Sequence, residues 1–338
     1  MQAAALLPLT GCAWLYGAAA LLRRGLYRSG ALRSVRLSGR VVSVGSLAGG
    51  GAGRLPTAAW IAAELHRRGH KVVLVSRGTA RRRGEPVLVV SDGRFVHGCA
   101  ESAGDEPMVL AARTPGVPVL VGRDPALVGL RALSAFGADL LVVDDGFRQH
   151  RLQRDVDVVT LDGEFGLGNG RLLPRGPLRE PIGVLRHADA VGVVDGPLPE
   201  ADAPRVDRCA PQAYRFAAKR RPRALRPLAG GRASPPGALA GKEVGLLAAL
   251  ARPASFRRTL ASLGARVVAQ RTFRDHHRYR ERDLRGLARE APLWVTTEKD
   301  AVKIPPSWVG RAEVRVLSID LEIEQAQHFA EWLESRLR

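Results

Sequence analysis

A glycine-rich segment directly behind an apolar run could bind phosphate. It reads GGGAGRLPT over residues 49–57 and follows Val41–Val44. Backbone N–H groups in such a turn, together with the N-terminus of a following helix, bind phosphate oxygens. The residues expected to contact a nucleotide phosphate are Gly49, Gly50, Gly51, Ala52, Gly53, Arg54 and Leu55. Taken alone, the segment is equally consistent with a tight turn between a strand and a helix.

Two positions of this segment depart from the usual phosphate-binding loop. Arg54 stands where such a loop normally carries lysine, and Leu55 stands where it normally carries serine or threonine. A guanidinium is a flat fork rather than a compact charge, and a leucine side chain cannot ligate Mg²⁺. Removing one preorganised donor typically costs about 2.7–4 kcal/mol of transition-state stabilisation. We therefore expect that phosphate chemistry at such a loop would be slowed rather than abolished.

A second apolar run, Leu140–Val143, ends in two adjacent carboxylates. Asp144 and Asp145 follow it directly, which is the arrangement that holds Mg²⁺ across from a phosphate loop. The alternative is that these acidic residues only begin a turn before Gly146. Because a phosphate loop precedes them in the chain, we favour a metal site formed by the two aspartates.

Two further pairs could carry acid–base chemistry. Asp105 and Glu106 lie in the stretch GDEP, and Asp275 precedes His276 in the C-terminal third of the chain. An imidazole can orient an aspartate that deprotonates an alcohol near neutral pH. A helix-capping or surface histidine is the alternative, and the residues alone leave both open.

The overall charge restricts the kinds of partner. The chain has 52 Lys and Arg against 33 Asp and Glu, a formal net charge of +19, so it is expected to attract anionic lipid, nucleic acid or phosphorylated substrates. Aromatic residues are only 5% of the chain and form no stacking pattern, which favours a membrane or an anionic substrate over nucleic acid. The isolated cysteines Cys12, Cys99 and Cys209 lack metal-site spacing and indicate a reducing compartment.

The N-terminal residues predict a helix associated with a membrane. Ala3–Leu22 carry no charge and are just long enough to span a bilayer, although Pro8, Gly11 and Gly17 weaken the helix. A basic flank follows: Arg23, Arg24, Arg28, Arg33 and Arg36. Such a flank favours the cytoplasmic face. We expect a helix in the membrane interface or a single anchor, with a buried N-terminal helix as the alternative.

Strands alternate with helices from residue 41 onward, which predicts a doubly wound α/β domain with ligands at the carboxyl ends of its strands. Residues 217–240 are rich in Pro, Gly and Arg, a composition typical of a linker. A second strand–helix series follows this stretch. The predicted divisions are 1–37 for the membrane-associated helix and basic flank, 38–216 for a P-loop-type nucleotide and substrate domain, 217–240 for the linker, and 241–338 for a smaller α/β domain.

Seven motifs in this order resemble the tetraacyldisaccharide 4′-kinase family, which phosphorylates the lipid disaccharide of the lipid A pathway. The motifs are VVSVGSLAGGGAGRLPT (41–57), SRG (76–78), GDEP (104–107), DDGFRQHRLQRD (144–155), GNGRLLPRGPLRE (168–180), FRDHHRY (273–279) and TTEKDAVKI (296–304). With the apolar N-terminal segment and its arginines, the resemblance covers almost the whole chain.

The resemblance implies two α/β domains facing a cleft and a membrane-seated N-terminal helix. It implies ATP and Mg²⁺ as cofactors, and it implies phosphorylation of the 4′-hydroxyl of a tetraacylated glucosamine disaccharide 1-phosphate, giving lipid IVA. We expect a monomer at the cytoplasmic face of the bacterial inner membrane that binds no nucleic acid. The family's catalytic dyad falls on Asp105 and His276, and its metal-binding and catalytic pair falls on Asp144 and Asp145. Residues in segments expected to line the substrate cleft are Arg77, Glu106, Arg123 and Glu180.

Three departures from the family pattern lie on the nucleotide side. The chain reads GGAGRL where the family usually reads GGTGKT, and the stretch after SRG lacks the usual tyrosine and glycine. After DDG, the histidine is moved one place, to His150, so we do not transfer the family's role to it. The alternative to a kinase is therefore a non-catalytic or weakly active member that binds lipid or nucleotide at the membrane.

Overall fold

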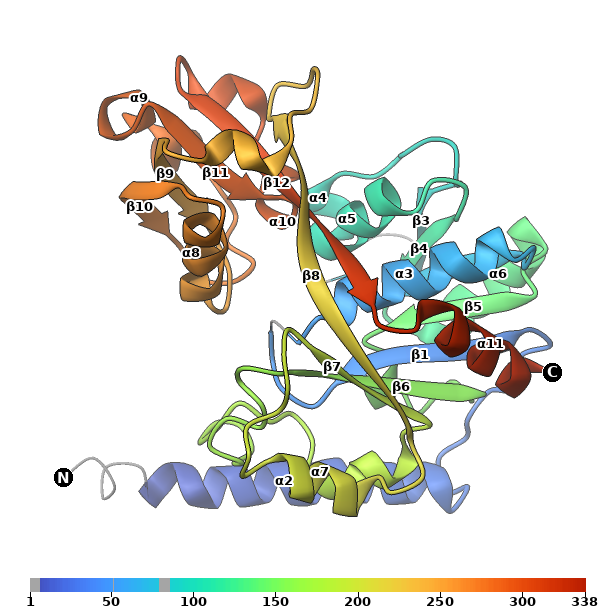
Figure 1. The fold of residues 1–338 in the computed structure, drawn as a ribbon. Coiled ribbons are helices and arrows are strands. Elements are labelled where there is room, and N and C mark those ends of the chain that lie inside the picture. Colours follow the sequence, from blue (N-terminus) through green and yellow to red (C-terminus); the bar gives the residue numbers. More distant parts are fainter. Residues whose placement is uncertain (1–6, 51, 79–85) are drawn as a thin grey trace.

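The computed structural model describes residues 7–50, 52–78 and 86–338. One mixed sheet of twelve strands runs through this part of the chain, in the order β10-β9-β11-β12-β8-β7-β6-β1-β5-β2-β4-β3 (Figure 1). Gly51 of the glycine-rich segment, and residues 79–81 behind SRG, lie outside the described residues.

The first block of the sheet contains the strands that lead to the glycine-rich segment and the acidic pair. It consists of β1 (Arg40–Ser46), β2 (Val72–Ser76), β3 (Val87–Ser91), β4 (Val119–Gly122), β5 (Leu140–Asp144), β6 (Val156–Asp162) and β7 (Ala190–Val194). Neighbours pair in parallel, except that β3 runs antiparallel to β4. Its central strands β1, β5 and β6 are buried along almost their whole length and rich in valine and leucine, as expected where both faces of a sheet are covered. The α/β class predicted from the sequence is confirmed, and the sheet is mixed rather than wholly parallel.

Helices pack on this sheet and connect its strands. Their bounds are α2 (Leu7–Arg28), α3 (Arg54–Arg67), α4 (Ala100–Ala103), α5 (Asp105–Arg113), α6 (Pro125–Phe136), α7 (Ala203–Cys209), α8 (Pro253–Ser262), α9 (Leu287–Glu290), α10 (Glu298–Ala301) and α11 (Ala326–Leu337). Short 3₁₀ turns lie at η1 (Gly146–Arg148), η2 (Ile182–His187), η3 (Pro236–Leu239), η4 (Glu281–Leu284) and η5 (Pro306–Val309).

Two long antiparallel strands, β8 (Tyr214–Pro227) and β12 (Glu313–Ile323), join the first block to a second one (Figure 1). The second block adds the parallel strands β9 (Glu243–Ala248), β10 (Arg266–Thr272) and β11 (Leu293–Thr297). Much of the stretch expected as a linker is therefore a paired strand. Pro222 fits there because it lies at an irregularity in the ladder, where the register shifts between Ser318 and Ile319.

The C-terminal helix α11 returns to the first block. Phe329 and Leu333 are buried in the same core as Val42 and Val156 of the central strands. The ring of Phe329 stacks on Phe216 of β8 with centroids 4.3 Å apart. The chain thus crosses between the blocks twice, through β8 and through β12. The predicted domain limits themselves stay a prediction.

Helix α2 lies along the surface of the first block (Figure 1). Ala13, Gly17 and Arg24 recur at helical spacing and are buried against the protein. On the other side, Trp14 and Leu15 are 73% and 74% exposed. Among the described residues, no helix combines the length and the apolar character needed to cross a bilayer.

Candidate active site

The glycine-rich segment forms the turn between β1 and α3. Gly50 and Gly53 have φ angles of 73° and 72°, a backbone region that disfavours residues with a side chain. A Cβ atom at Gly53 would also lie 2.6 Å from Val194 Cγ2. No side chain caps the N-terminus of α3, so its first N–H groups remain directed at the space in front of the helix.

Arg54 begins α3 and joins two carboxylates from other elements. Its guanidinium forms an ion pair with Asp144 at the end of β5 and another, over 2.9 Å, with Oε2 of Glu106 in the first turn of α5. Burial opposes the positive charge, but Asp144 and Glu106 raise the pKa of Arg54 well above its ordinary value. The arginine therefore stays charged and ties the phosphate loop to both carboxylates.

The loop offers no hydroxyl to replace the one lost at Leu55. Leu55 packs against the core of the first block and also lines the cavity in front of α3. The nearest hydroxyl along the chain belongs to Thr57, whose Oγ1 donates a hydrogen bond to the carbonyl of Gly53 over 2.8 Å. Side-chain oxygen for a metal must therefore come from other elements.

Asp144 and Asp145 are the acidic groups placed for that task. Burial raises the pKa of Asp144, Arg54 opposes the rise, and the charges of Glu106 and Asp145 add to it. Asp145 has a φ of 55°, and its Oδ2 lies 3.6 Å from Arg179. Its Oδ1 is buried without a hydrogen-bond partner among the described residues. An additional cation would relieve both the repulsion and the unpaired oxygen, so the pair fits Mg²⁺.

The fit to Mg²⁺ depends on ligands from outside the protein. Within residues 7–50, 52–78 and 86–338, no group of three or more Asp, Glu, His or Cys side chains is arranged to hold a metal. Mg²⁺ commonly binds through one or two carboxylates while phosphate oxygens and water complete its shell. The two aspartates meet that minimum.

Asp105 and His276 meet across the two blocks although they are 171 residues apart in the chain. Asp105 begins α5 and is 3% exposed, and His276 follows β10 with a φ of 59°. Nδ1 of His276 lies 2.9 Å and 3.1 Å from the two carboxylate oxygens of Asp105. Burial alone would raise the pKa of Asp105, but the hydrogen bond from His276 and the charges of Lys299 and Lys303 lower it to about 2. The hydrogen bond to Asp105 raises the pKa of His276.

Two lysines complete this cluster. Lys299 Nζ lies 3.0 Å from Asp275 Oδ1, 3.3 Å from His276 Nε2 and 3.6 Å from Glu106 Oε1. Lys303 Nζ lies 3.4 Å from Asp105 Oδ2. Lys299 lies in α10 and Lys303 follows its end, and both contact the Asp105–His276 cluster. Sequence reasoning did not single them out, although both lie in the motif TTEKDAVKI.

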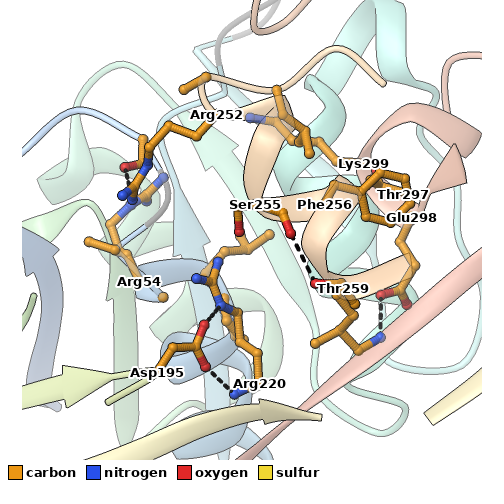
Figure 2. Close-up of a pocket in the computed structure, with 18 of the residues that line it drawn as sticks. Arg54, Asp195, Arg220, Arg252, Ser255, Phe256, Thr259, Thr297, Glu298 and Lys299 are labelled. Atoms are coloured by element: carbon orange, nitrogen blue, oxygen red, sulfur yellow. Dashed lines mark hydrogen bonds and ion pairs between the residues drawn. The ribbon is translucent and has the colours of Figure 1, made fainter. Parts of the chain in front are cut away.

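A cavity of about 570 Å³ lies between the phosphate loop, β8 and α8. Arg54 faces it from α3, Arg220 from β8, and Ser255, Phe256 and Thr259 from α8 (Figure 2). Glu106, which contacts both Arg54 and Lys299, also lines it, as do His276 and Lys299. The cavity therefore connects the phosphate loop to the aspartate–histidine pair.

The cavity is rich in arginine. Arg252 donates a hydrogen bond to Asp162 Oδ2 over 2.9 Å and another to the carbonyl of Gly50 over 3.3 Å. Arg220 pairs with Asp195, and Arg179 also lines the wall. Cations held by buried or half-buried carboxylates suit an anionic ligand such as a triphosphate. These arginines were not identified from the sequence, where 52 basic residues gave no means of ranking them.

The model of the Tetraacyldisaccharide-1-P 4′-kinase family matches residues 3–338. The chain belongs to this family. A protein named tetraacyldisaccharide 4′-kinase from Anaeromyxobacter dehalogenans strain 2CP-C is 44% identical over 330 residues, which cover 91% of this chain and 84% of the relative. A protein of the same name from Syntrophus aciditrophicus strain SB is 38% identical over 333 residues, covering 93% of this chain and 88% of the relative.

A solved structure of a family member has a similar fold. The crystal structure of LpxK from Aquifex aeolicus in complex with ATP is similar with a TM-score of 0.78 and 28% sequence identity. The match covers 100% of both chains. The continuous sheet and its two blocks are thus features that this chain shares with a member of the family.

Not all residues expected from the family motifs lie at the cavity. Gly50, Ala52, Gly53, Arg54, Leu55, Glu106 and His276 line it, and Asp105 lies behind His276. The amide of Gly49 instead donates to the carbonyl of Pro177 over 3.0 Å. Arg77 and Arg123 are exposed and are not among the described residues that line the cavity.

Glu180 and His150 lie beneath α2 rather than at the cavity. Glu180 is buried, and its Oε1 lies 3.4 Å from Arg148 Nε. His150 is also buried, with its ring 5.9 Å from that of Tyr27 in α2. Burial and the charge of Arg24 lower the pKa of His150 to about 3, so this imidazole is neutral. The residue beside Glu180, Arg179, is the one in that motif that reaches the cavity.

Proposed function

We propose that this chain transfers the γ-phosphoryl group of ATP to the 4′-hydroxyl of a tetraacylated glucosamine disaccharide 1-phosphate, giving lipid IVA. Membership of the 4′-kinase family over nearly the whole chain supports the reaction, and the relative solved with ATP supports the donor. The observation that carries the proposal is the Asp105–His276 hydrogen bond beside a cavity that the phosphate loop also lines. A kinase needs both features, whereas a non-catalytic binding protein does not need the buried pair.

Asp105 and His276 act on the acceptor hydroxyl. His276 lines the cavity and Asp105 holds its Nδ1, so the proton of the 4′-hydroxyl passes to this pair as the oxygen attacks the γ-phosphorus of ATP and the bond from that phosphorus to ADP breaks. Glu106 stands beside Asp105, with Arg54 and Lys299 on its two oxygens, and fixes the start of α5 against the phosphate loop. Arg77, Arg123 and Glu180 remain proposed substrate contacts only through the motifs in which they lie.

The phosphate groups of ATP lie against the amides of the glycine-rich loop and the cations around it. Arg54, Arg220 and Arg252 reach this region from α3, β8 and the start of α8. Mg²⁺ held by Asp144 and Asp145 would neutralise charge on the phosphate oxygens. Positioning and charge stabilisation account for most of the rate of phosphoryl transfer.

Helix α2 brings this site to a membrane. Its exposed face carries Trp14, Leu15 and Leu22, and Arg23 and Arg28 follow on the same helix. An apolar face with basic residues at its end lies in the interface of an anionic bilayer. We place this face on the cytoplasmic side of the bacterial inner membrane, where the acyl chains of the substrate also lie. The monomeric state stays a prediction.

A phosphoryl-transfer assay tests the proposal. Purified protein, radiolabelled ATP, Mg²⁺ and the disaccharide 1-phosphate are expected to give labelled lipid, and Asp105→Ala is expected to remove most of that signal. No transfer above the Asp105→Ala control would refute the enzymatic proposal. Mg²⁺-dependent binding of a non-hydrolysable ATP analogue, measured by calorimetry, would distinguish an inactive nucleotide-binding protein from a protein that binds only lipid.

A further inference from the structure

The second carboxylate oxygen of Asp105 has a partner besides His276, and this partner is not among the described residues that line the cavity. Nδ1 of His276 lies 2.9 Å from Oδ1 of Asp105 and 3.1 Å from Oδ2, and Nζ of Lys303 lies 3.4 Å from Oδ2. The side chain of Lys303 is only 8% exposed, and the residue is not among those that line the cavity. The carboxylate is therefore held between an imidazole in front and an ammonium group behind.

Lys303 is itself fixed by a buried carboxylate. Its Nζ lies 3.0 Å from Oδ1 of Asp300, which has no solvent exposure. The other oxygen of Asp300 accepts hydrogen bonds from Thr297 Oγ1 over 2.8 Å and from the amide of Ala249 over 3.1 Å. These contacts anchor Asp300 to the start of α10 and to the end of β9. Lys303 is thus held by the frame of the second block.

Lys299, one turn earlier, has a different position. It lines the cavity and contacts Glu106, Asp275 and the outer nitrogen of His276. A lysine there can meet a phosphate oxygen of a substrate. Lys303 cannot, because Asp105 separates it from His276 and the cavity. Lys303 also lies over the ring of Tyr279, with Nζ 5.4 Å from its centroid, but its contact with a residue of the proposed base is the one with Asp105.

We propose that Lys303, anchored by Asp300, is the positioning residue that fixes the Asp105 carboxylate toward His276. The inference rests on the proposed role of Asp105 as part of the base. His276 lies close to both oxygens and by itself does not distinguish between them. The amide of Glu106, which donates to Oδ1 over 3.0 Å, and Lys303, which pairs with Oδ2, together fix the plane of the carboxylate so that Oδ1 is the oxygen nearer to His276. Misplacement of a reacting group by about 1 Å can cost roughly 10²-fold in rate.

The charge of Lys303 has a second consequence for the pair. Asp105 is faced by His276, Lys299 and Lys303, and His276 is faced by Asp105, Asp275 and Lys299. Removing Lys303 takes away one of the positive charges that face Asp105. The carboxylate then interacts more strongly with the remaining cations, including the protonated imidazole of His276. The pKa of His276 then rises further. General loss of structure would have the opposite effect, because the pKa of His276 would then return toward the ordinary histidine value of about 6.5.

The experiment uses Lys303→Met, the conservative Lys303→Arg, and the exposed Lys242→Met as a matched control. Lys303→Met is expected to lower kcat by about 10²-fold with little change in KM for ATP. It is also expected to raise the pKa of His276, followed by NMR of the ring, by about one pH unit. Lys303→Arg should recover most of kcat, and Lys242→Met should match wild type.

Folding is controlled by the double variant Asp300→Asn with Lys303→Met. It removes one charge of each sign, and the asparagine oxygen can still accept from Thr297 and Ala249, so it should fold and show the same loss of kcat. An unchanged kcat and an unchanged His276 pKa in either folded variant would overturn the inference. A rise in KM for ATP without a fall in kcat would overturn it too. Wild-type turnover by Asp105→Asn would instead refute the proposed role of Asp105.

Discussion

The buried charge of Arg54 predicts how stability responds when that charge is removed. Arg54→Met keeps a long side chain but leaves Asp144 and Glu106 without the cation that they share. Removing one partner of a buried ion pair typically costs about 3–5 kcal/mol. Glu106 retains Lys299 at 3.6 Å, so we expect a value near the lower end.

This free energy converts into a melting temperature. Unfolding entropy of about 2.1 cal/mol/K per residue gives about 0.7 kcal/mol/K for this chain, so a loss near the lower end of that range should lower Tm by about 4–5 °C. Arg54→Lys is the matched control, because it retains a positive charge that can reach the same carboxylates. We expect its Tm to fall by less than half as much. Differential scanning fluorimetry at fixed protein concentration measures both.

Magnesium provides a second measurement on the same variants. Arg54 competes with a metal for Asp144, so Mg²⁺ should raise the Tm of Arg54→Met more than that of wild type. Adding Asp145→Asn to Arg54→Met should reduce this rise in Tm. A ligand present at 100 times its Kd stabilises by about 2.7 kcal/mol. A Tm for Arg54→Met within about 1 °C of wild type would refute the reasoning about the ion pair. Equal Mg²⁺ shifts in all the variants would refute the assignment of the metal to this acidic pair.

Three further predictions concern turnover, pH dependence and membrane binding. The double change Arg54→Lys with Leu55→Thr should raise kcat at least about tenfold by restoring part of the lost stabilisation, and a slower enzyme would show that the loop has a different, compensated geometry. Because the pKa of His276 is raised while that of Asp105 is about 2, kcat/KM should fall as pH drops through the raised pKa of the histidine, with Asp105 still ionised. A flat profile down to about pH 5, roughly 1.5 units below the ordinary pKa of histidine, would contradict this in a stopped assay. Leu15→Glu should weaken co-sedimentation with anionic vesicles by about tenfold or more, whereas Val268→Glu on β10 should not, and equal losses would argue against a specific role of α2.

Local patterns predicted the elements of the first block well. The sequence alone predicts a helix over Pro125–Phe136 and a strand over Ala190–Val194, and α6 and β7 have these bounds. Both predictions are local, because an Asp-Pro helix start and a continuous apolar run act through near neighbours. Asp124 indeed accepts a hydrogen bond from the amide of Ala126 over 3.0 Å. Strand β8 was not predicted, because its arginines and prolines resemble a linker until β12 supplies a pairing partner.

The sequence by itself determined which chemical groups the chain carries and in which order. The glycine-rich loop, the acidic pair and the family motifs depend on residue type and short spacing, so they can be recognised without coordinates, and the family membership follows from them. The tertiary structure alone decided which of these groups meet. Asp105 and His276 form one hydrogen bond, Lys303 stands behind it, and Glu180 lies beneath α2 away from the cavity. Such contacts arise where distant segments pack together across β8 and β12, and no local pattern specifies the packing of residues 171 positions apart.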